Sequence, residues 1–134
     1  MPRPPLRSVL ASVGGTIALL GSFLPWLRTG ERERTSYDLS GLARRLEVAT
    51  GPLERAAVTA WPAVPFVLLC AVVLLVMRCS TGARVFGLVV AGYVLAVPAI
   101  VLGSPLEVRF GAVVTVVGAS VLVVACLLRE RARA

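Results

Sequence analysis

The stretch that decides the fold runs from Phe23 to Phe66 and reads FLPWLRTGERERTSYDLSGLARRLEVATGPLERAAVTAWPAVPF. It is a charged segment inside a chain in which apolar residues make up 57% and the mean hydropathy is +0.88. Two tryptophans and four prolines lie within it. The long apolar runs on either side of this segment indicate the architecture.

Four runs of the sequence contain no charged residue: about residues 8–27, 58–77, 85–102 and 110–128. Each run approaches the roughly 20 residues that a helix needs to cross a hydrocarbon core about 30 Å thick. A soluble helix of this length would show a polar face. The sequence therefore predicts an all-α integral membrane protein, a four-helix bundle that forms one domain over residues 1–134.

Short connections join the last three runs. Ser104, Pro105 and Glu107 have the spacing of a capping box with proline at the first helical position. We therefore expect the fourth span to start at residue 105 and to end near residue 128. Short links favour antiparallel neighbours in a bundle, and Pro98 predicts a kink in the third span.

The connection over residues 28–57 is the long one, and it carries an apolar stripe at helical spacing: Leu39, Leu42, Leu46 and Ala49. We predict a short amphipathic helix that lies along the membrane surface. Asp38 or Ser40 would cap its start, and Gly51-Pro52 would end it. The alternative is a solvated loop in which the pattern arises by chance.

Tryptophan prefers the headgroup level of a bilayer, so Trp26 and Trp61 should mark where the chain leaves and re-enters the membrane. Between them the charged segment would cover one face of the bundle. This predicts a candidate interaction surface made of eight residues: Trp26, Tyr37, Asp38, Leu42, Arg44, Arg45, Leu46 and Trp61.

Helices associate in lipid through small residues that let backbones approach closely. Such residues recur along the first, third and fourth spans, and the expected packing positions are Gly14, Gly21, Gly87, Ala91, Gly111 and Gly118. Whether one of these faces meets a partner protein instead of a neighbouring helix stays open at this point.

The sequence offers little for catalysis, and we expect no enzyme, no metal and no cofactor. There is no histidine, and Cys70, Cys79 and Cys126 are scattered singly. No carboxylate lies inside a span. This disfavours ion-coupled transport, for which the small multidrug exporters need a glutamate within their first helix. The polar candidates in the loop form only a weak cluster: Ser36, Tyr37, Asp38, Ser40 and Glu47.

The net charge is +7 and every basic residue is arginine. Because these arginines flank the spans, we expect them to meet anionic lipid headgroups and not nucleic acid. An even number of spans places both termini on one side. The arginines divide equally between the sides, but most acids lie on the loop side, so we expect both termini in the cytoplasm of a multi-pass plasma-membrane protein.

The string GSFLPWLRTG at residues 21–30, followed by TSYDLSGL at residues 35–42, resembles small actinobacterial four-span membrane proteins with a Leu-Pro-Trp exit from the first helix. The resemblance covers the first 45 residues and implies an extracytoplasmic first loop. It implies no activity, and it transfers no functional residue.

Together these observations predict a non-enzymatic accessory or assembly subunit of a membrane complex. It would dock a membrane-protein partner through its first loop or a small-residue helix face. The alternative is a small carrier of lipid or hydrophobic solute that works as a homo-oligomer.

Overall fold

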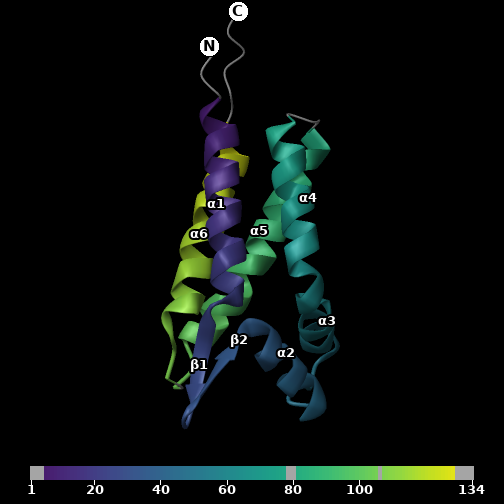
Figure 1. The fold of residues 1–134 in the computed structure, drawn as a ribbon. Coiled ribbons are helices and arrows are strands. Elements are labelled where there is room, and N and C mark those ends of the chain that lie inside the picture. Colours follow the sequence, from purple (N-terminus) through teal and green to yellow (C-terminus); the bar gives the residue numbers. More distant parts are fainter. Residues whose placement is uncertain (1–4, 78–80, 106, 129–134) are drawn as a thin grey trace, which may run out of the picture.

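The computed structural model describes residues 5–77, 81–105 and 107–128, and within them the chain is mostly helical (Figure 1). Cys79 and the turn at residues 78–80 lie outside the described residues. Four helical segments are long and apolar enough to cross a membrane: Leu6–Phe23, Pro52–Val76, Thr81–Leu102 and Phe110–Leu127. The fourth begins at Phe110, not at residue 105 as predicted.

The elements follow the chain in this order: α1 (Leu6–Phe23), β1 (Pro25–Thr29), β2 (Arg32–Thr35), α2 (Ser36–Arg45), α3 (Pro52–Ala60), the 3-10 turn η1 (Trp61–Ala63), α4 (Val64–Val76), α5 (Thr81–Leu102) and α6 (Phe110–Leu127). The second span is thus a helix broken in its middle, where Pro62 and Pro65 remove backbone donors. Its helical part starts six residues before the expected residue 58, since α3 opens at Pro52.

The four long helices form a bundle in which α1 packs against α6 and α4, and α5 packs against the same two helices. Helices α1 and α5 therefore lie on a diagonal. The start of α1 and the end of α6 lie at one end of the bundle, while the strands and α2 lie at the other (Figure 1). The neighbours α4–α5 and α5–α6 are those that the short connections predict.

Helices α1 and α6 make the most extensive pairing, and glycines allow it. A Cβ added at Gly14 would lie 2.8 Å from the backbone nitrogen of Leu122, and one at Gly118 would lie 2.7 Å from the Cα of Ala18. Gly21 meets Thr115 in the same way. These contacts run antiparallel along the two helices, so a side chain does not fit at Gly14, Gly21 or Gly118.

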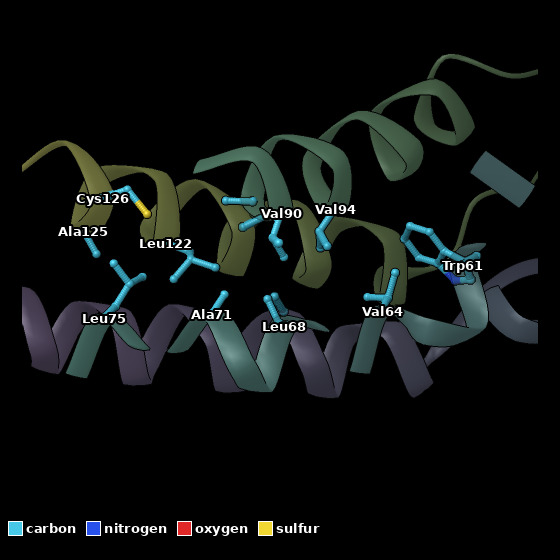
Figure 2. Close-up of a cluster of buried hydrophobic side chains, with 14 of the residues drawn as sticks. Trp61, Val64, Leu68, Ala71, Leu75, Val90, Val94, Leu122, Ala125 and Cys126 are labelled. Atoms are coloured by element: carbon cyan, nitrogen blue, oxygen red, sulfur yellow. The ribbon is translucent and has the colours of Figure 1, made fainter. Parts of the chain in front are cut away.

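The other side of the bundle is filled by larger side chains from three helices, shown in Figure 2: Leu68, Leu75, Val90, Val94, Leu122 and Cys126. Gly87 of α5 lies among them, where an added Cβ would stand 3.1 Å from both Cys126 Sγ and Leu75 Cδ1. Ala83 and Ala91 are buried on the same face of α5. Pro98 lies inside α5, which is assigned as one continuous helix across it.

A β-hairpin that the sequence analysis did not predict follows α1. Strands β1 and β2 pair antiparallel around Gly30, whose φ of +62° suits glycine. The other edge of β1 pairs with the α5–α6 connection, where Arg109 N–H donates to the Trp26 carbonyl (2.7 Å) and Arg28 N–H to that of Glu107 (3.2 Å).

This pairing corrects the predicted capping box. Residues 107–109 are drawn into extended structure beside β1, so Glu107 does not cap α6, and Arg109 takes the N-cap position without a side-chain cap. Ser104 instead closes α5, since its hydroxyl donates to the carbonyl of Val101 (2.6 Å).

Helix α2 exists where an amphipathic helix was expected, but its bounds differ. Thr35 is its N-cap and forms a reciprocal capping box with Asp38, so Asp38 and Ser40 lie inside the helix. Its buried residues are Ser36 and Ser40, not members of the leucine stripe.

The helix ends at Arg45 because Glu47 adopts a left-handed φ of 49°. The N–H of Val48 then reaches back to the carbonyl of Ala43 (3.3 Å), as in a Schellman motif. Leu46 and Ala49 therefore fall outside the helix. Gly51-Pro52 does not end α2 as expected; it opens α3, with Pro52 at the first position.

Candidate functional site

The candidate site lies where the segment from Pro25 to Ala60, called the cap below, meets the end of the bundle. Three hydroxyls attach the cap to α1. Ser36 Oγ donates to the Ser22 carbonyl (2.6 Å), and Ser22 Oγ lies 2.9 Å from the Tyr37 hydroxyl. The Tyr37 ring also packs on Phe23, with ring centroids 5.0 Å apart. The start of α2 is thereby fixed to the end of α1.

Burial raises the pKa of Tyr37 above its usual value, and the hydrogen bond between its hydroxyl and that of Ser22 acts in the opposite direction. The other polar candidates have local structural partners. Ser40 donates to the Tyr37 carbonyl (2.9 Å), and the Asp38 carboxylate accepts from Thr35 at the helix start. These side chains therefore stabilise the first turns of α2. Glu47 lies just beyond the C-terminal end of the same helix.

The two tryptophans come together inside the protein. Trp26 is 1% exposed and Trp61 is 2% exposed, and their rings meet edge to face with centroids 5.4 Å apart. The bulge in β1 between Pro25 and Leu27 turns Trp26 inward, where its Nε1 donates to the Gly21 carbonyl (2.9 Å). Both rings are therefore removed from the predicted interaction surface by contacts within the protein.

Trp61 also packs against Tyr93 of α5, with ring centroids 5.7 Å apart, and the Tyr93 hydroxyl donates to the carbonyl of Ala57. The indole nitrogen of Trp61 is buried and, in contrast to that of Trp26, lacks a hydrogen-bond partner among the described residues. A buried donor without an acceptor is uncommon in folded proteins.

A pocket of about 170 Å³ lies beside the two indoles, between α2, α3 and α5. Its walls are mainly apolar, and they include Trp26, Trp61, Leu39, Ala43, Val58 and Val97. Its volume is close to the roughly 150 Å³ of apolar cavities that take up a benzene-sized molecule. Sequence reasoning missed this pocket because its walls come from three segments far apart in the chain.

A second hollow of about 270 Å³ adjoins the pocket, and the two share Ala43 and Val58. Charged side chains line this outer hollow: Arg44, Glu47 and Arg55. Arg55 Nε donates to the Ala49 carbonyl (3.1 Å), and within the described part of the chain neither arginine forms an ion pair. The pocket is therefore mainly apolar, and the adjoining hollow carries two arginines and one glutamate.

The outer rim of the cap exposes apolar side chains at the α2–α3 turn. Leu46 is 63% exposed, Val48 65% and Leu53 82%. Of the remaining predicted surface residues, Asp38, Arg44 and Arg45 are exposed, whereas Tyr37 and Leu42 are half-buried. The structure thus gathers part of the predicted surface on α2 and adds Val48 and Leu53, which the stripe did not include.

No group of three potential metal ligands occurs in residues 5–77, 81–105 and 107–128. Cys70 is exposed on α4 and Cys126 is buried between helices. Comparison of the chain with protein-family models, with curated proteins and with solved structures finds no match. The resemblance to actinobacterial four-span proteins stays a prediction.

Proposed function

We propose that this chain is a multi-pass plasma-membrane protein that serves as a non-enzymatic accessory or assembly subunit. Four helices of sufficient length and hydropathy support the membrane assignment. The termini would be cytoplasmic and the cap extracytoplasmic. The cap would dock a membrane-protein partner.

The observation that carries this proposal is the exposed apolar rim on a firmly attached cap. Leu46, Val48 and Leu53 project from the α2–α3 turn, at the far end of elements held in place by the Ser22–Ser36–Tyr37 contacts. A fixed surface loses less conformational entropy on binding than a flexible loop. The rim therefore suits a protein partner whose apolar surface would cover it.

The alternative docking surface, a small-residue helix face, is less well supported. Gly14, Gly21 and Gly118 face the α1–α6 crossing, and Gly111 meets the backbone at Leu24. Gly87 and Ala91 face the inside of the bundle. These positions are occupied by the protein's own helices, which leaves the cap as the favoured partner surface.

The test is purification of the full chain from its native membrane in mild detergent. We expect a partner at constant stoichiometry, lost in Leu53→Ala with Val48→Ala. Val89→Ala is the matched control, because Val89 of α5 is 66% exposed, as Val48 is 65% exposed on the cap. The absence of a stoichiometric partner, or its survival in the cap variant, would contradict the docking proposal.

A second candidate, a small oligomeric carrier of lipid or hydrophobic solute, is favoured by the apolar pocket beside Trp26 and Trp61. In the same purification it predicts a homo-oligomer that retains lipid and contains no second protein. The two candidates are thus separated by one experiment.

A further inference from the structure

We propose that the pocket and the adjoining hollow form one binding site for an anionic glycerophospholipid of the surrounding membrane. The phosphate would lie between Arg44 and Arg55, and the glycerol-proximal part of one acyl chain would enter the pocket beside Trp26 and Trp61. The inference rests on the proposed membrane insertion, but it is independent of a protein partner.

The shape and polarity of the site match an amphiphile. The inner pocket is lined by apolar groups from α2, α3 and α5, whereas the outer hollow carries the charged groups. Ala43 and Val58 line both, so the pocket and the hollow are adjacent, and an amphiphile that spans them would meet an apolar wall at one end and a charged wall at the other. A free inorganic anion would leave the apolar part of this surface unfilled.

The charges favour a negative headgroup. Arg44 and Arg55 face the hollow together with one carboxylate, that of Glu47, so two positive charges oppose one negative charge. Arginine suits phosphate because its planar guanidinium presents several donors at once. The nearby Glu54 carboxylate accepts from the backbone N–H groups of Thr50 and Gly51 and is thereby engaged in the start of α3.

The unpartnered indole of Trp61 is the third observation. Trp61 is 2% exposed, lines the pocket, and within the described residues its Nε1 has no acceptor. An ester carbonyl at the glycerol end of a lipid chain supplies such an acceptor at the boundary between polar and apolar groups. Occupation of the pocket, together with a turn of the indole ring that brings Nε1 toward the lipid, would satisfy a donor that the described residues leave unpaired.

The two tryptophans provide the assay, because they are the only ones in the chain and both line the pocket. Phospholipid that carries bromine on the glycerol-proximal part of its acyl chains quenches indole fluorescence on contact. Both indoles are buried, so lipid that merely surrounds the protein in a micelle reaches them poorly. We expect saturable quenching by brominated phosphatidylglycerol at concentrations where brominated phosphatidylcholine quenches little.

Charge variants identify the headgroup site. Arg44→Gln and Arg55→Gln should each weaken the apparent affinity for phosphatidylglycerol about fivefold, and Glu47→Gln should strengthen it. Arg45→Gln is the matched control, since it removes the same charge from the same helix without lining the hollow. Equal loss in all three arginine variants would attribute the effect to general surface potential and overturn the proposal.

A steric pair identifies the chain site. Ala43→Leu fills the shared wall and should abolish quenching, whereas Ala56→Leu on the exposed side of α3 should leave it unchanged. Quenching that is equal for the two headgroups, or that persists in Ala43→Leu, would contradict the site. A chain that stays in solution without detergent would instead contradict the membrane assignment, so the two failures are distinguishable.

Discussion

The indole rings of Trp26 and Trp61 meet edge to face, with centroids 5.4 Å apart and planes inclined at 71°. Each residue stands at one end of the charged connection, Trp26 just after α1 and Trp61 just before α4. Their contact therefore closes the connection into a loop whose ends are fixed in the protein interior. Aromatic pairs of this geometry contribute about 0.5–1.5 kcal/mol beyond the area that they bury.

The first prediction concerns the crossing of α1 and α6. Gly118→Ala should strongly destabilise the bundle, because the new methyl would overlap the backbone of Ala18, which cannot rotate away. Overpacking of this kind costs about 1–3 kcal/mol or more. Gly92→Ala is the control, since nothing lies within 4 Å of a Cβ at Gly92. Thermal unfolding in detergent measures both; equal midpoints would refute the close crossing.

The second prediction separates two positions on α5. Gly87→Leu should lower the unfolding temperature far more than Val89→Leu, because an added Cβ at Gly87 already meets Cys126 and Leu75 at 3.1 Å. Val89 is 66% exposed, so a larger apolar side chain there meets no protein neighbour. Gly87→Ala should be milder than Gly118→Ala, since flexible side-chain ends can move where backbone cannot. Thermal aggregation, with expression level as a control, provides the comparison.

Small residues recur along α1, α5 and α6, and in the structure Gly14, Gly87 and Gly118 lie against neighbouring helices. The β-hairpin has no comparable pattern in the sequence. Its strands read PWLRT and RERT, without the alternation typical of a sheet, and β1 is completed by residues 107–109 from the distant α5–α6 connection. The end of α2 could not be predicted from the sequence either, because Glu47 and not a glycine adopts the left-handed conformation that ends the helix.

That glutamate gives the third prediction. Glu47→Gly should stabilise the cap by about 0.5–1 kcal/mol, because a left-handed φ strains residues that carry a Cβ. Glu47→Ala removes the same carboxylate but keeps the Cβ, so it should bring no gain. Resistance of the α2–α3 turn to trypsin is the measurement. If both variants behave alike, the effect comes from the charge and not from the backbone.

The fourth prediction concerns orientation. A reporter active only outside the cytoplasm should stay inactive at the C-terminus and become active when inserted at the exposed Gly30 turn. The reason is that the cap side carries most of the acids, while an even number of spans keeps both termini together. The opposite pattern of activity would reverse the assigned sides without altering the bundle.

The fifth prediction tests how the cap is attached. Ser36→Ala removes the buried hydrogen bond to the Ser22 carbonyl, which is worth about 1 kcal/mol. The start of α2 should then open more often, and trypsin should cut after Arg44 and Arg45 several-fold faster. Tyr37→Phe should act in the same direction by removing the hydroxyl that meets Ser22 Oγ.

Ser120→Ala is the control for both substitutions. Its hydroxyl bonds only to the Val116 carbonyl of its own helix and lies on an exposed face of α6, so cleavage of the cap should stay at the parental rate. Because Ser36 and Tyr37 both contact Ser22, their effects on the opening of α2 should not simply add. Parental cleavage rates in Ser36→Ala and Tyr37→Phe would mean that these hydroxyl contacts do not hold the start of α2 in place.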